Sequence, residues 1–178
     1  MRDMGLKGQG ETGKAYLSGS HNLKNNCGYI IHTIGPDTRG KKSQSDWVEH
    51  EQKLTDAYNN TLEVASSNNI TQTAFCAIST AIYGCPIEKT TPVAINTIID
   101  HIQRHPHTHT QTQEIRFVTY SALDYNVYRD YLTNLSNQNS PILSSVSVDE
   151  SSSKLSQLLA KSSSDATTQP PLLYSINS

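Results

Sequence analysis

The stretch TAFCAISTAIYGCP, residues 73–86, decides how this chain is expected to fold. Thr73 to Ser79 form an apolar run typical of a buried strand, and the small residues and glycine after it break that run. Residues 79–86 are therefore predicted to be a loop at the carboxyl end of a strand, where open α/β sheets bind ligands. Such a loop can curl round an anion and bind it through amide N–H groups, although an ordinary connecting loop has the same composition.

Two further strands are predicted outside this stretch. Residues 28–35, GYIIHTIG, and 114–121, EIRFVTYS, are apolar runs rich in β-branched and aromatic residues. Tyr16 to Ser18 could add a fourth strand. Runs of this kind are nearly continuous in apolar residues, as expected for strands that helices cover on both faces.

Helical periodicity follows each of the three main strands. The first helix is expected over 45–69 with Ser45 as its N-cap, and the last over 123–135. Between them, a helix is expected from Thr91, which would place Pro92 in its first turn, the position that proline tolerates. The order β-α-β-α-β-α predicts an α/β fold with a mostly parallel sheet and right-handed crossovers.

The two ends of the chain have a different composition from its middle. Residues 137–178 are rich in Ser, Gln and Pro and cannot bury enough apolar surface to offset chain entropy, so they are predicted to be a disordered tail. Residues 1–11 are predicted to be a flexible leader that contains glycine. Within it, GQGETGK resembles a phosphate-binding P-loop, but no strand precedes it and no helix-forming sequence follows. The folded domain is therefore expected over 12–136.

Charge, hydropathy and cysteine usage argue against several classes of protein. The formal net charge of the 178 residues is −2, and the only short basic run is 39–42, so no nucleic-acid partner is expected. No apolar run is long enough to span a membrane, and no signal peptide opens the chain. An odd number of cysteines, Cys27, Cys76 and Cys85, argues against a disulfide framework. A cytoplasmic or nuclear protein is expected.

Four segments together resemble the second half of a macro domain. They are GYIIHTIGPD, LTDAYNNTLEVASSNNI, FCAISTAIYGCPIEKTTPVAINTI and FVTYSALDYNVYRDYL, and the resemblance covers roughly residues 12–135. It implies a three-layer α/β/α module that binds ADP-ribose or an ADP-ribosylated protein. The loop round the diphosphate would consist of Ser79, Thr80, Ala81, Ile82, Tyr83 and Gly84. Tyr120, Ser121 and Tyr125 would lie on the adenine side.

Three departures from the family pattern stand out. Ala81 occupies a position where the family usually has glycine, which would strain the loop if that residue needs a positive φ. Pro92 lies where the family's helix is normally under way, so the helix is expected to start later here. The family's first half, with its Asn-Ala-Ala-Asn stretch and glycine-rich loop, does not precede Thr12. The fold is therefore predicted to be incomplete, with an open sheet edge that could allow self-association.

The remaining candidates for chemistry are histidines and acidic residues. His101 and His105 are spaced i, i+4 and could take Zn²⁺ or Ni²⁺ adventitiously, but neither a functional metal site nor a cofactor is predicted. His32 is expected to be a satisfied core histidine, and Asp124 a helix N-cap. No catalytic residue can be assigned. For a hydrolase, Glu11 and Asp37 are the only acidic residues near enough in the sequence to be considered.

The first functional hypothesis is therefore a binding module with a residual or degenerate ADP-ribose cleft. The alternatives are an ADP-ribosyl hydrolase, which would remove ADP-ribose from protein or act on O-acetyl-ADP-ribose, and a non-catalytic scaffold that acts through its Ser-rich tail. A further interpretation is an incomplete gene product that starts at an internal Met.

Overall fold

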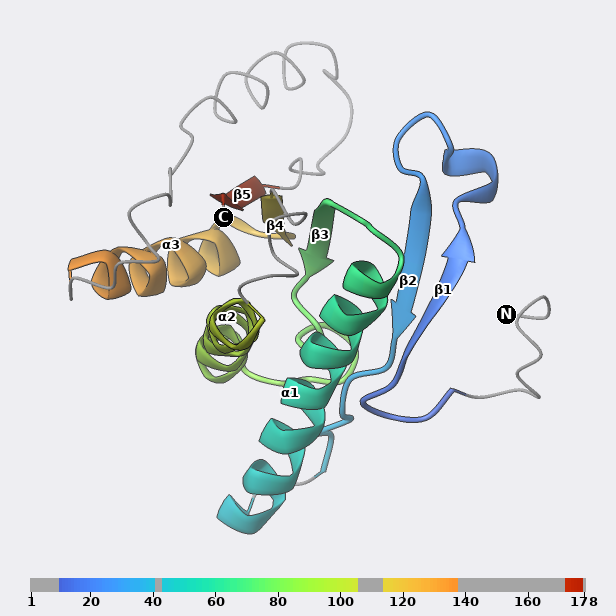
Figure 1. Ribbon diagram of the computed structural model, residues 1–178. Helices are drawn as coiled ribbons and strands as arrows, with labels where there is room; N and C mark the ends of the chain where they lie inside the picture. Colours follow the sequence, from blue (N-terminus) through green and yellow to red (C-terminus); the bar gives the residue numbers. More distant parts are fainter. Residues whose placement is uncertain (1–9, 41–42, 106–113, 138–171, 178) are drawn as a thin grey trace, which may run out of the picture.

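The computed structural model describes residues 10–40, 43–105, 114–137 and 172–177 (Figure 1). The leader over 1–9 and most of the tail therefore lie outside the described residues. The elements follow one another in the order β1 (Ala15–Gly19), a short 3-10 helix (His21–Leu23), β2 (Tyr29–Thr33), α1 (Gln44–Ser67), β3 (Gln72–Cys76), α2 (Ile87–Arg104), β4 (Glu114–Thr119), α3 (Ala122–Asn137) and β5 (Leu172–Asn177). The α/β fold class expected from the sequence is confirmed.

The strands form two separate sheets within the described residues. β1 and β2 make an antiparallel pair, in which Ala15 lies opposite Thr33 and Gly19 opposite Tyr29. β3 pairs with β4 in parallel, and β4 pairs with β5 in an antiparallel register. The expected extra strand at Tyr16 to Ser18 is thus present as part of β1. The pairing departs from a mostly parallel sheet, because only the β3–β4 ladder is parallel.

One hydrophobic core joins the three helices to β3 and β4. α1 supplies Leu54 and Tyr58, α2 supplies Ile95 and Ile98, and all four side chains are fully buried. The aromatic rings of Phe75 on β3, Phe117 on β4 and Tyr128 on α3 lie in contact beneath them, with centroid distances of 6.3 Å and 4.8 Å. Since α2 packs between α1 and α3, the helices form one layer (Figure 1). This layer packs through the core on β3 and β4.

Burial along β4 alternates, which shows that one face of this sheet is covered. Ile115, Phe117 and Thr119 are buried, whereas Arg116 between them is exposed. On β3, Phe75 is buried while Ala74 and Cys76 are exposed. The second helical layer of the expected α/β/α sandwich is therefore not among the described elements.

The helix starts differ from those expected. The N-cap of α1 is two residues earlier than expected, because Ser43 rather than Ser45 caps the helix and Asp46 completes a capping box with it. α3 begins at Ala122, where Ser121 Oγ accepts from the Asp124 amide at 3.1 Å. Asp124 therefore lies in the first turn of α3 and is not its N-cap.

Pro92 lies inside α2, contrary to the expectation of a helix that starts near Thr91. α2 begins at Ile87 with Pro86 as its N-cap. Pro92 is the sixth residue of α2, so its missing N–H removes only the hydrogen bond to the Glu88 carbonyl, near the start of the helix. Burial of Thr90, Thr91 and Val93 holds this turn in place.

The predicted tail, 137–178, contains one described element besides the end of α3. Residues 172–177 form β5 against β4, which differs from a tail that is unstructured throughout. Across the part of the chain that the structure describes, no helix has both the length and the apolar character needed to cross a membrane.

Candidate functional site

The predicted ligand loop, residues 79–84, leaves the carboxyl end of β3 and packs against the end of the β2 segment. A Cβ built on Gly35 would lie 2.1 Å from Ser79 Oγ and 2.4 Å from Ile78 Cγ2. Only glycine allows the two backbones to approach this closely. The tight contact at Gly35 thus brings the loop after β2 beside the loop after β3.

The loop closes on itself through its own backbone. The Cys85 amide donates to the Ser79 carbonyl at 3.0 Å, and the Gly84 amide donates to the Ala81 carbonyl at 3.1 Å. Ser79 and Gly84 take positive φ angles of 68° and 67°. Because Ala81 is not among the residues with positive φ, the strain considered for Ala81 falls on Ser79 instead, where it costs about 1–2 kcal/mol.

The crest of the loop presents backbone donors. Within the described part of the chain, the amides of Ala81, Ile82 and Tyr83 donate no hydrogen bond. Ala81 is exposed, and the Ile82 side chain is 79% exposed. Beneath them, Ser79 Oγ is buried and has no partner among the described residues. Successive amides of this kind form a concave nest that suits an anion.

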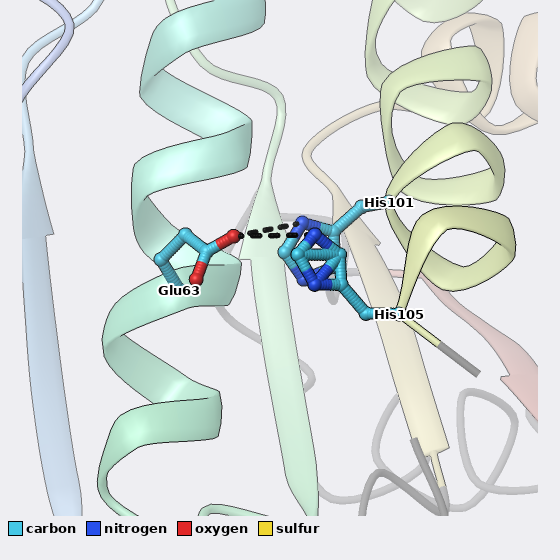
Figure 2. A group of neighbouring side chains, drawn as sticks. All are labelled: Glu63, His101 and His105. Atoms are coloured by element: carbon cyan, nitrogen blue, oxygen red, sulfur yellow. Dashed lines mark ion pairs between the residues drawn. The ribbon is translucent and has the colours of Figure 1, made fainter. Parts of the chain in front are cut away.

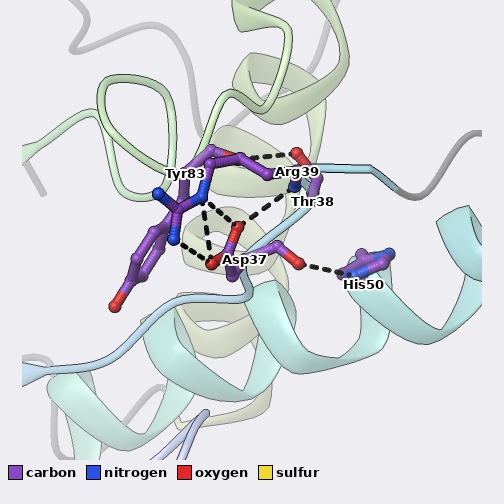
Figure 3. Close-up of polar contacts among 5 residues, drawn as sticks. All are labelled: Asp37, Thr38, Arg39, His50 and Tyr83. Carbon is purple, nitrogen blue, oxygen red and sulfur yellow. Dashed lines mark hydrogen bonds and ion pairs between the residues drawn. The ribbon is translucent and has the colours of Figure 1, made fainter.

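A polar network ties Tyr83 to the loop after β2 (Figure 3). The Tyr83 carbonyl accepts from the Thr38 amide at 3.1 Å and from Thr38 Oγ1 at 2.8 Å. The Arg39 guanidinium lies 5.7 Å from the centroid of the Tyr83 ring and pairs with the Asp37 carboxylate at 2.5 Å. The His50 ring, from α1, contacts the Asp37 carbonyl at 3.1 Å. The network fixes the position of Tyr83 and places one cation beside the loop.

Hydrogen bonding to Asp37 raises the pKa of Arg39 above its ordinary value, and the Coulomb attraction of the same carboxylate acts in the same direction. Asp37 accepts from the Arg39 amide and from two guanidinium nitrogens. The Asp37 carboxylate is therefore engaged. Glu11 is exposed, and no contact in the described residues joins its side chain to the loop.

The residues predicted for the adenine side lie on the neighbouring strand. β3 and β4 run in parallel with Cys76 beside Val118, so Tyr120 and Ser121 leave the same end of the sheet as the loop. The Tyr120 side chain is 80% exposed, and Tyr125 is half-buried in the first turn of α3. Ser121 uses its hydroxyl to cap α3. The structure thus brings both groups of predicted residues to one edge of the sheet.

Cys85 directly follows this loop and is buried. Burial raises the pKa of the Cys85 thiol, and the nearby Lys89 only partly opposes that effect. The thiol therefore stays protonated at neutral pH and is a poor nucleophile. All three cysteines are free, and Cys27 and Cys76 are exposed.

A cavity of about 420 Å³ lies beside the loop on its α1 side. Its lining includes Arg39, Gly84, His50 and Lys89, whose ammonium lies 4.9 Å from the centroid of the Trp47 ring. Two permanent cations, Arg39 and Lys89, thus border the loop. The sequence did not single out Thr38, Arg39 or His50, since their link to Tyr83 depends on a tertiary contact.

A larger cavity, about 550 Å³, separates the two sheets. It is lined by Tyr29 to Ile31 of β2 on one side and by Gln72 to Cys76 of β3 on the other. Among the described strands, β2 pairs only with β1, and β3 only with β4. Each therefore presents an unpaired edge to this cavity, which we name the interstrand slot.

The fold and the loop define an α/β domain with a candidate anion-binding loop at the carboxyl ends of its strands. Residues 2–94 match the Macro domain family model, and the chain belongs to this family. A macro domain-containing protein of Caldanaerobacter subterraneus is 34% identical over 117 residues, which is 66% of this chain and 60% of that protein. The ADP-ribose glycohydrolase MACROD2 of Homo sapiens is 33% identical over 119 residues, 67% of this chain and 26% of that protein.

Other similar proteins extend these comparisons. The O-acetyl-ADP-ribose deacetylase of Cronobacter sakazakii is 35% identical over 103 residues, 58% of this chain and 52% of that protein. The Oceanobacillus iheyensis macrodomain with ADP superposes with a TM-score of 0.63 at 28% identity and covers 78% of this chain and 67% of that one. The chain spans between 26% and 60% of the length of the three curated relatives named here.

Proposed function

We propose that this chain is an ADP-ribose-binding macro module in which the amides of Ala81, Ile82 and Tyr83 hold the diphosphate. The observation that carries the proposal is that three consecutive amides at the exposed crest of the loop donate no hydrogen bond to any described residue. Lys89 nearby favours a dianion electrostatically, whereas the charge of Arg39 is largely offset by Asp37. The relatives named for ADP-ribose chemistry and the Oceanobacillus macrodomain with ADP support the same ligand class.

We place the adenine at Tyr120, with Ser121 and Tyr125 beside it. Neighbouring strands lie about 4.8 Å apart, so one ligand can contact the ends of both β3 and β4. The exposed Tyr120 ring offers a face for a purine to stack on. Because Ala81 and Ile82 at the crest of the loop are exposed, the ligand would remain partly solvated and the affinity is expected to be weak.

Calorimetric titration with ADP-ribose tests this proposal. Ile82→Pro removes one of the three amide donors, and Ile82→Ala is the matched control because the Ile82 side chain is exposed and packs little. The proline variant should bind at least tenfold more weakly, and the alanine variant as the wild type does. Equal binding by all three proteins, or none by the wild type at millimolar ligand, would refute the assignment of the loop.

The ligand series separates the two ends of the site. ADP should retain most of the affinity of ADP-ribose, whereas adenosine, which lacks phosphate, should lose it. Tyr120→Ala should weaken ADP and ADP-ribose equally, and Tyr120→Phe should restore binding because it keeps the aromatic face. If Tyr120→Ala has no effect on any ligand, the adenine does not lie there.

A second candidate function is ADP-ribosyl hydrolysis, which the position of Asp37 favours. Its backbone contacts His50, and its neighbours Thr38 and Arg39 both contact Tyr83, so Asp37 lies next to the proposed ligand loop. Incubation with a mono-ADP-ribosylated protein should then release ADP-ribose at a rate that Asp37→Asn lowers. The matched control Glu11→Gln should leave the rate unchanged. No release above background would exclude this function for this chain.

We also infer that the interstrand slot accepts an extended segment of a second copy of this chain. Both edges that line it lack a partner among the described strands, and such edges pair readily with another strand. Ala74→Lys adds an exposed charge on the β3 edge and should shift the protein towards monomer in light-scattering measurements. A wild type that is monomeric at all concentrations would contradict the inference.

A further inference from the structure

Three metal-ligating side chains meet where α1 and α2 pack together, far from the loop. Figure 2 shows Glu63 of α1 pointing at His101 and His105, which lie at the carboxyl end of α2. Glu63 Oε1 lies 3.7 Å from His101 Nδ1 and 3.7 Å from His105 Nε2. We propose that these residues, which we name the His–Glu cluster, form a zinc-binding site.

The two histidines are arranged by the helix itself. Residues four apart lie on one face, one turn above the other, so the imidazoles stack with their centroids 4.7 Å apart and their planes at 14°. Because the rings are nearly parallel, a nitrogen of each can point to the same side, where Glu63 lies (Figure 2). One cation can therefore contact both rings and the carboxylate.

The spacing fits a shared cation better than direct hydrogen bonds. At 3.7 Å, neither imidazole nitrogen is hydrogen-bonded to Glu63 Oε1. The three ligand atoms all lie within 4.8 Å of one another. In a tetrahedral zinc site with bonds of about 2.0–2.1 Å, ligand atoms lie about 3.3 Å apart. A small rotation of the exposed side chains would reach that geometry.

One of the three ligand side chains is buried, and the other two are partly open to solvent. The His101 side chain is 1% exposed and is held in the core, whereas the His105 and Glu63 side chains are 34% and 52% exposed. A metal can therefore enter from solvent and retain water in its fourth position. Two nitrogens and one carboxylate oxygen suit Zn²⁺ or a similar borderline ion, whereas Mg²⁺ and Ca²⁺ prefer oxygen ligands alone.

The position in the fold indicates a structural role. Ile87, at the start of α2, follows the ligand loop, and His101 lies about 21 Å further along the helix at 1.5 Å per residue. The ion would therefore not touch ADP-ribose. It would instead fasten α1 to α2 at the end of the helix pair opposite the loop, so its effect should appear as stability.

A competition titration of the full chain with Zn²⁺ and a fluorescent chelator tests the proposal. We expect one equivalent to bind, and thermal unfolding to shift upward by about 5–10 °C at a hundredfold excess over the dissociation constant. Glu63→Gln changes an exposed side chain and His105→Ala a partly exposed one, so both variants should fold. Each should bind Zn²⁺ at least tenfold more weakly and lose the thermal shift.

A control variant separates the His–Glu cluster from nearby histidines in the sequence. His107 and His109 lie outside the described residues, and changing both to alanine should leave the affinity and the thermal shift unchanged. Co²⁺ in place of Zn²⁺ should give visible absorption bands of a tetrahedral ion in the wild type and in this control, but not in Glu63→Gln. Binding that survives Glu63→Gln and His105→Ala, or that needs His107 and His109, would overturn the proposal.

Discussion

The helical side of the molecule and the β1–β2 ribbon differ in how completely they are packed. Among the described residues, the side chains of the hydrophobic core belong to the helices, to β3 and β4, or to the loop between β3 and α2. No residue of β1 or β2 is fully buried. The helical side therefore has a core of its own, whereas the ribbon depends on its attachment to α1. Changes in the two regions should differ in size.

The largest effect should come from the aromatic centre of the core. Phe117→Ala leaves a cavity between Phe75 and Tyr128 and should lower the free energy of unfolding by about 3–5 kcal/mol. Ile31→Ala in the half-buried ribbon should cost about 1 kcal/mol. Urea unfolding of both variants measures the difference. Equal losses would mean that the ribbon is as much part of the core as β4.

A second effect is the dependence of the core's stability on pH. Burial raises the pKa of Tyr128 to about 12, from an ordinary value near 10, and also raises the pKa of Tyr58. In the unfolded chain the phenol ionises near pH 10, whereas in the folded chain it stays neutral to about pH 12. The stability that Tyr128 contributes is therefore complete below pH 10 and falls by about 2–3 kcal/mol as the pH rises to 12.

Tyr128→Phe provides the control for that pH dependence. The variant has no phenol at this position, so its unfolding free energy should fall less steeply between pH 10 and 12 than that of the wild type. Identical slopes in the two proteins would show that other groups cause the alkaline loss. Chemical denaturation at several pH values measures both slopes.

A smaller effect should come from the joint between the two regions. The Gly13 amide donates to the Ile34 carbonyl at 2.7 Å, and Asn60 Nδ2 of α1 donates to the Gly13 carbonyl at 2.7 Å. Gly13 has φ +86°, and an added Cβ would lie 3.1 Å from Asp56 Cβ. Gly13→Ala should cost about 1–2 kcal/mol, and amide exchange in β1 and β2 should accelerate more than in β4.

Gly19→Ala is the matched change for Gly13→Ala. No atom lies within 4 Å of a Cβ added at Gly19, which is at the end of β1. This variant should therefore be close to neutral. A loss as large as that of Gly13→Ala would show that the joint has no special role in holding the ribbon.

Much of this fold could be predicted from local pattern. The apolar runs around Phe75 and Phe117 identified two strands of the sheet, and the glycines and small residues after β3 identified the loop. Glycine also marks the turn at Thr12 and Gly13 ahead of β1, where Gly13 takes a positive φ. These features depend on neighbours in sequence, which is why single-sequence reasoning could find them.

The parts that were missed depend on tertiary contacts. The antiparallel pairing of β1 with β2 cannot be read from two short runs, since either direction buries the same side chains. His32 was expected in the core but is only partly buried, and it contacts Ser18 Oγ at 2.8 Å across that pair. Glu63 joins His101 only because α1 packs on α2. Pro92 was assigned to a first turn because its cost was judged without the burial around it.

The proline inside α2 also bears on local unfolding at the start of that helix. Without an amide hydrogen at Pro92, the Glu88 carbonyl receives no bond from the next turn, so buried side chains hold residues 87–91 in place of a complete backbone ladder. Such a turn can open alone, without the cooperative loss of the rest of the helix. We therefore expect amide hydrogen exchange at the start of α2 to be faster than at Ile95 and Ile98, which are fully buried.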